Sequence, residues 1–163
     1  MSTNIPDGRR LLLVLQQHLD GHARRTEHWA LVAIGPRTRE ADVFQMSGNM
    51  ESFHFEAIRV PNVLKVAAIC GGYPLGYVAE DAMERLHAML AAQRVVLHDW
   101  EWDCQDWVVE AVRALRQEKG EWVSMNEGFS EATLRRELRA EKDLWEIGED
   151  HLFERMLNAQ NAS

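Results

Sequence analysis

The clearest candidate for chemistry in this chain is the cysteine of the motif Asp-Cys-Gln-Asp-Trp-Val, residues 103–108. Asp103 is a suitable N-cap, so the pattern predicts that Cys104 lies in the first turn of a helix. A helix N-terminus favours thiolate over thiol, and its N–H groups can hydrogen-bond an oxyanion. We therefore expect Cys104 to be a nucleophile that reacts with iodoacetamide below the pH required by an ordinary cysteine. The alternative is a buried structural cysteine, which is our interpretation of Cys70.

A base for this nucleophile is available in the His-Trp-Ala motif of residues 28–30, which begins a predicted strand. If His28 faces the helix-covered side of the sheet, it can accept the thiol proton. A third group must orient the imidazole; Gln45 on the next strand is the leading candidate and His54 the second. The alternatives are that His28 has a structural role and that Gln45 points to solvent.

Tryptophans surround the expected position of the thiol. Trp100, Trp102 and Trp107 would form an aromatic wall suited to an apolar acyl or aromatic substrate, although such residues also serve as core anchors. The residues expected to bind substrate are Trp29, Trp102 and Trp107. The chain has no Cys/His cluster with metal-ligand spacing, no glycine-rich phosphate loop and no serine nucleophile elbow. We therefore expect neither a metal nor a cofactor.

Composition limits the partners. The 163 residues carry a formal net charge of −8 and a pI near 5.3, which argues against nucleic acid and anionic membranes as partners. The sequence shows no secretory signal, no membrane-spanning apolar run and no disulfide framework. We expect a cytoplasmic protein with reduced thiols, no membrane partner, and a small-molecule or acyl-carrier-bound substrate; the oligomeric state stays open.

Apolar periodicity predicts strands in the first half of the chain and helices in the second. The expected strands are 11–15, 28–34, 43–46, 53–60 and 63–69, and the expected helices are 78–93, 103–119 and 130–157, with a loop at 71–76 and a possible break at Gly148. This order indicates an α+β fold, an antiparallel sheet of four to five strands packed against helices. We expect one domain over 1–163, with a core of 9–120 and a helical extension of 130–158.

The predicted helix after Asp103 has one apolar face that must pack on the sheet. Its members recur at helical spacing: Cys104, Trp107, Val108, Ala111, Val112 and Leu115. Cys104 would then point toward the sheet from the end of the helix.

The two motifs together resemble the circularly permuted papain-like superfamily. His-Trp-Ala on one strand, a polar residue on the next and Asp-Cys-Gln-Asp-Trp-Val at a helix start are similar to the NlpC-type and lecithin:retinol acyltransferase-like branches, and to small, mostly uncharacterised fungal members. The resemblance covers about 28–115 and implies a permuted papain-like fold, with Cys104 as nucleophile and His28 as base. The family's second histidine position falls on Gln45.

Two features depart from that pattern. Asp103 replaces the usual asparagine and places a carboxylate beside the thiol, which opposes thiolate formation. The C-terminal membrane anchor of the acyltransferase branch is replaced by an acidic helical segment.

The function we expect is a soluble cysteine-nucleophile hydrolase or acyltransferase acting on an amide, ester or thioester. The alternatives are a non-catalytic small-molecule-binding or tailoring protein on the same scaffold, or an isopeptidase.

Overall fold

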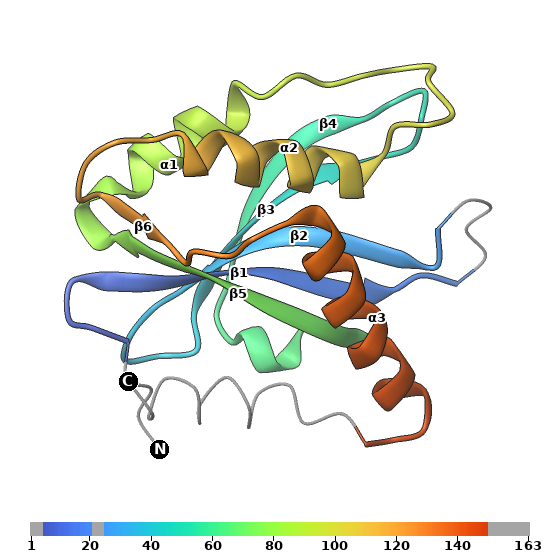
Figure 1. Ribbon diagram of the computed structural model, residues 1–163, viewed down its shortest axis with the longest axis horizontal. Coiled ribbons are helices and arrows are strands. Elements are labelled where there is room, and N and C mark those ends of the chain that lie inside the picture. Colours follow the sequence, from blue (N-terminus) through green and yellow to red (C-terminus); the bar gives the residue numbers. More distant parts are fainter. Residues whose placement is uncertain (1–4, 21–24, 150–163) are drawn as a thin grey trace.

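The chain folds into one curved antiparallel sheet with its helices packed on one face (Figure 1). The computed structural model describes residues 5–20 and 25–149. Within them the strand order is β4-β3-β2-β1-β5-β6. The strands are β1 (Arg9–His18), β2 (Glu27–Ile34), β3 (Ala41–Ser47), β4 (His54–Val60), β5 (Ile69–Ala79) and β6 (Val123–Met125).

The helices begin at side-chain caps where the sequence supplies them. The described segments contain α1 (Met83–Ala91), α2 (Cys104–Arg116), α3 (Glu131–Glu146) and the 3-10 turns η1 (Val63–Lys65) and η2 (Glu80–Ala82). Asp103 and Asp106 form a capping box at the start of α2, and Ser130 caps α3. The predicted N-cap of α2 is thus confirmed, as is the buried face of that helix.

Both faces of the central strands are buried, which explains their continuous apolar runs. One core cluster lies between the sheet and the helices and includes Leu12, Trp29, Phe44, Trp107 and Leu134. The second covers the opposite face and is formed by alternate strand residues with Ile5 and η1: its members include Leu13, Ala30, Val32, Val43 and Val63. Residue parity along a strand therefore tells which face a side chain occupies.

The predicted α+β class is confirmed, but the middle of the chain differs from expectation. The predicted strand 63–69 is wrong, because η1 occupies its start and β5 begins only at its end. β5 then runs through the glycine- and proline-rich residues 71–76 that predicted a loop. A register shift against β1 accompanies Pro74, which has no N–H to donate.

The sheet has six strands rather than four or five, because β6 was missed. β6 pairs with β5 close to Gly76, whose φ is +151° and where a Cβ would overlap the Ser124 carbonyl oxygen. Only glycine permits this approach. The extension of β5 to Ala79 also shortens the first helix, which begins at Met83 rather than at residue 78.

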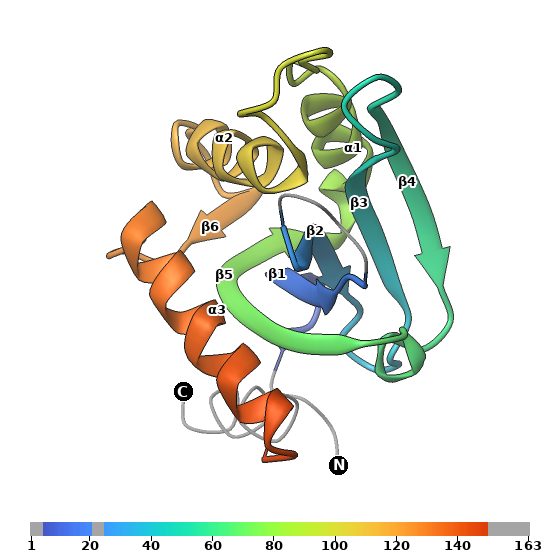
Figure 2. The same ribbon diagram turned by 90° about the vertical axis from the view of Figure 1, so that its right-hand side faces the viewer.

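α3, the last helix of the described residues, packs on β5, as the view turned by 90° shows (Figure 2). α3 ends at Glu146, and Gly148 follows with φ +73°, so the helix stops where a glycine break was expected. The remainder of the predicted extension, 150–158, lies outside the described residues. None of the helices in the described segments is long and apolar enough to cross a membrane.

Candidate functional site

Cys104 is the first residue of α2, and its sulfur lies against the start of β2. The backbone N–H of Trp29, which belongs to the peptide bond that follows His28, donates to the thiol. The residue is buried, with 7% of its surface exposed. This burial raises the pKa of Cys104 to about 11, the Asp103 carboxylate acts in the same direction, and the Trp29 N–H and Arg25 oppose them. The predicted lowering of the thiol pKa is therefore wrong: burial outweighs the helix N-terminus.

Asp103 uses much of the donor capacity of the first helical turn. Its carboxylate accepts from the N–H groups of Gln105 and Asp106, and Arg25 Nε donates to its Oδ2 over 2.9 Å. Of the helix-start N–H groups expected to hold an oxyanion, those of Gln105 and Asp106 are therefore already used by Asp103. The ion pair with Arg25 also offsets the negative charge that Asp103 places beside the sulfur.

His28 is held by a chain of side chains across three strands. Its Nε2 lies 2.8 Å from Gln45 Oε1 on β3, and Gln45 Nε2 donates over 2.8 Å to Glu56 Oε1 on β4. Because a carboxylate only accepts, the Gln45 amide must turn its NH₂ to Glu56 and its oxygen to His28. The neutral imidazole then carries its proton on Nε2, and its lone pair is on Nδ1.

The structure chooses between the two predicted orienting residues. Gln45 contacts the ring of His28, whereas His54 Nδ1 bonds to the Ser52 carbonyl oxygen in the turn before β4. Glu56, which fixes the amide of Gln45, was not predicted. Glu56 is one of many acidic residues in the sequence, and only the β3–β4 register shows that it lies opposite Gln45.

The expected orientation of His28 requires a correction. Along β2, Trp29 belongs to the helix-side core and Ala30 to the opposite core, so alternation groups His28 with Ala30. The β2–β3 ladder ends at the Leu31–Phe44 pair although both strands continue. The Cys104 sulfur reaches the backbone N–H of Trp29 just beyond that point. The thiol therefore contacts the peptide bond that follows His28, whereas alternation directs the His28 ring to the opposite face of the sheet.

The three tryptophans predicted to bind substrate occupy different environments. Trp107 has 1% of its surface exposed and packs on Phe55, and Trp102 is buried with its N–H bonded 2.8 Å from Glu110 Oε2. The structure thus places both in the core. Trp29 is also largely buried, and its Nε1 donates to Gln16 Oε1 over 3.0 Å, but its ring borders a pocket.

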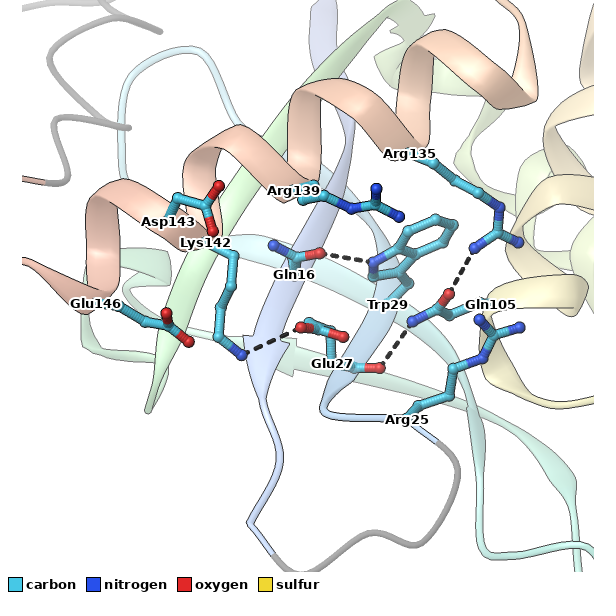
Figure 3. Close-up of a pocket in the computed structure, with 10 residues that line it drawn as sticks. All are labelled: Gln16, Arg25, Glu27, Trp29, Gln105, Arg135, Arg139, Lys142, Asp143 and Glu146. Carbon is cyan, nitrogen blue, oxygen red and sulfur yellow. Dashed lines mark hydrogen bonds and ion pairs between the residues drawn. The ribbon is translucent and has the colours of Figure 1, made fainter.

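That pocket, of about 240 Å³, lies between α3 and the starts of β2 and α2 (Figure 3). Its lining is polar and charged, and none of the α3 residues in it was predicted to have a role. The ten residues that line it are Gln16, Arg25, Glu27, Trp29, Gln105, Arg135, Arg139, Lys142, Asp143 and Glu146. Among the described residues, no group of three or more His, Cys, Asp or Glu side chains is arranged to hold a metal ion.

Comparison with known proteins gives a family but no activity. Searches of the curated proteins and of the solved structures returned no match. One family model matches residues 15–120, a span that contains His28, Gln45 and Cys104 and ends before α3. Because that match covers more than half of the chain, the protein belongs to a family of unknown function, DUF6540.

Proposed function

We propose that the protein is a cytoplasmic thiol hydrolase or acyltransferase of permuted papain-like type, acting on a small acyl substrate. The observation that carries the proposal is the contact of the Cys104 thiol with the peptide bond that follows His28, close to the point where the β2–β3 pairing ends. The Cys104 thiol is bound by the peptide N–H that follows His28, and the His28 ring is held by Gln45. A nucleophile, a base and a residue that orients the base are the parts that thiol acyl transfer requires.

In the proposed reaction the thiol and imidazole act together, because the raised pKa leaves Cys104 protonated at neutral pH. His28 Nδ1 takes the thiol proton as the sulfur attacks the acyl carbonyl carbon, and the carbonyl oxygen becomes an oxyanion near the Cys104 N–H. Collapse of this intermediate breaks the bond to the leaving group, which receives the proton from His28. Water or an acceptor, deprotonated by His28, then attacks the thioester and regenerates the thiol.

Gln45 and Glu56 give this base its direction. Because the Gln45 oxygen accepts from Nε2–H, the lone pair of the neutral ring is on Nδ1. A ring in this tautomer can accept a proton at Nδ1. Gln45 also stabilises the imidazolium that forms after proton transfer, because its oxygen continues to accept from Nε2. Glu56 acts through Gln45 and is a positioning residue.

The test is turnover on a panel of activated esters, thioesters and anilides. We expect wild-type protein to turn over at least one class, and Cys104→Ala and His28→Ala to lose at least a hundredfold in kcat/KM. Cys70→Ala is the matched control for removal of a thiol and is expected to retain activity. Equal rates in wild type, Cys104→Ala and His28→Ala would refute the proposal.

A second candidate is a non-catalytic binding protein on the same scaffold. The burial of Cys104 and its high pKa favour this function, since both describe a thiol that is inert at rest. The two candidates differ in one outcome: a binding protein never acquires an acyl group on Cys104, whereas the proposed enzyme does.

A further inference from the structure

The pocket under α3 gathers cationic side chains from two separate segments. Arg135, Arg139 and Lys142 occur at helical spacing on one face of α3, and Arg25 precedes β2. Like charges on one helix face destabilise a helix by a few tenths of a kcal/mol per pair. Their convergence on a hollow therefore calls for a physical reason beyond packing.

Three of the four cations are partly neutralised. Arg135 pairs with Glu131 over 2.9 Å within α3, and the other two pair with groups outside that helix. Lys142 Nζ lies 3.2 Å from Glu27 Oε1 and 2.8 Å from His18 Nδ1, and Arg25 pairs with Asp103. Both are therefore fixed in place by groups of the fold itself.

Two guanidiniums keep donors available toward the hollow. Arg135 Nε donates to Glu131 Oε2 over 2.9 Å and its Nη1 donates to Gln105 Oε1 over 2.8 Å. Its Cζ lies 4.9 Å from the centroid of the Trp29 ring. These contacts hold the guanidinium in place and leave the N–H groups of Nη2 to donate to a ligand. Arg139 is exposed and, within the described part of the chain, has no hydrogen-bond or ion-pair partner. A guanidinium fork is the side chain best matched to carboxylate and phosphate oxygens.

The charges are spread unevenly along the pocket, because both carboxylates of α3 lie at one end together with Lys142 (Figure 3). Arg135, Gln105 and Arg25 lie at one end, near the start of α2, and Asp143 and Glu146 lie at the other. A compound with one anionic group suits the first end, whereas a large polyanion would meet the two carboxylates at the second. The volume of about 240 Å³ also limits the occupant to a small molecule or to one end of a larger one.

The basic end adjoins the candidate nucleophile. Trp29 and Gln105 line the pocket, and their backbone N–H groups both hydrogen-bond the Cys104 sulfur. We propose that this pocket binds the single carboxylate or phosphate group of an acyl substrate, with Arg139 and Arg135 as its ligands. The identification of the ligand as a substrate rests on the proposed function, whereas the binding of an anionic group does not.

The binding test uses the full chain carrying Cys104→Ala, so that no turnover occurs, and isothermal titration in a buffer without phosphate. The probes are inorganic phosphate, N-acetylglycine as the carboxylate, N-acetylphosphoethanolamine as the phosphate, and N-acetylglycinamide as the uncharged match of N-acetylglycine. We expect at least one anionic N-acetyl probe to bind about tenfold or more tightly than the amide, and the preferred probe tells carboxylate from phosphate. Equal affinity for charged and uncharged probes would overturn the proposal.

Two arginines of α3 provide a matched pair of variants. Arg139→Gln is expected to weaken the anionic probe about tenfold or more, the loss of one charge-assisted contact. Arg136→Gln removes an exposed arginine next to the pocket but not in its lining, and should change affinity less than twofold. Equal losses in both variants would show that binding depends on overall charge and would contradict the site.

Failure of this inference and failure of the proposed function give different results. Anion binding that requires Arg139, in a wild-type protein that never acylates Cys104, supports the pocket and refutes the enzyme. Acylation of Cys104 with equal kcat/KM for anionic and neutral acyl donors supports the enzyme and refutes the pocket.

Discussion

At the scale of single residues, the environment of Cys104 sets the chemistry that is open to it. A thiol with a pKa near 11 is protonated at neutral pH, so it acts as a nucleophile only when a base removes its proton during the attack. In the proposed mechanism His28 therefore contributes more than it would beside a preformed thiolate. Its tautomer, fixed by Gln45 and Glu56, is a direct consequence of the structure.

Alkylation measures the state of the sulfur. In a Cys70→Ala background we expect iodoacetamide to label Cys104 slowly at pH 8 and faster as the pH approaches 11, because burial disfavours the thiolate. The rate should be compared with that of the same protein unfolded in urea. Faster labelling of the folded than of the unfolded chain at pH 7 would contradict the raised pKa.

Nitrogen NMR measures the orientation of the base. The ¹⁵N shifts of the neutral His28 ring should show the Nε2–H tautomer, and Gln45→Leu should remove that preference because no acceptor is left at Nε2. Glu56→Ala, which frees the Gln45 amide to rotate, should weaken it. Glu51→Ala, a change in the exposed turn before β4, is the control and should leave the spectrum of His28 unchanged.

At the scale of elements, the site depends on how α3 docks on the sheet. Gln16 on β1 joins the pieces: its Nε2 donates to the carbonyl oxygens of Cys70 and Leu138, and its oxygen accepts from Trp29. A buried amide with these bonds satisfied fixes α3 against β5. Close approach of the two elements requires the absence of a side chain at Gly71.

Substitution of that glycine tests the packing. In Gly71→Ala the new Cβ would lie 2.8 Å from Gln16 Nε2 and 3.1 Å from the Cβ of Glu141 on α3. We expect urea denaturation to show a loss of about 1–3 kcal/mol in the free energy of unfolding. Gly35→Ala is the matched control, since its nearest neighbour would be 3.5 Å away. A similar effect of both substitutions would mean that α3 does not sit as described.

Local signals predicted some elements, and tertiary pairing decided the others. The α2 cap was predictable because Asp103 acts on N–H groups two and three residues ahead. β5 was not, since its glycines and Pro74 are typical of a loop and form a strand only when β1 and β6 pair with them. Gln45 was predicted from its place on the strand after His28. Glu56 was found only from the β3–β4 register, and Arg139 only from the docking of α3 beside the pocket.

At the scale of the whole molecule, the raised pKa of Cys104 makes the free energy of unfolding depend on pH. The folded state holds the thiol proton more tightly than the unfolded chain, because the pKa rises from 9.0 to about 11. The associated stability is complete below pH 9 and is lost as the pH rises through 11, since the unfolded chain binds fewer protons in that window. The difference amounts to roughly 2–3 kcal/mol.

Alkaline denaturation measures this linkage. Between pH 8.5 and 11 the free energy of unfolding of the wild type should fall by roughly 2–3 kcal/mol more than that of Cys104→Ala, which lacks the titrating group. Urea titrations of both proteins at four pH values give the comparison and cancel the contribution of the other titrating residues. Parallel pH profiles would show that Cys104 has an ordinary pKa.

The central claim is that Cys104 forms a thioester with an acyl donor with the help of His28. Intact-mass spectrometry after mixing with an activated acyl thioester and rapid acid quench measures this most directly. We predict a single acyl mass increment that maps to Cys104, is absent in Cys104→Ala and forms at least a hundredfold more slowly in His28→Ala. An adduct that forms equally fast without His28, or that resides on another residue, would contradict the account.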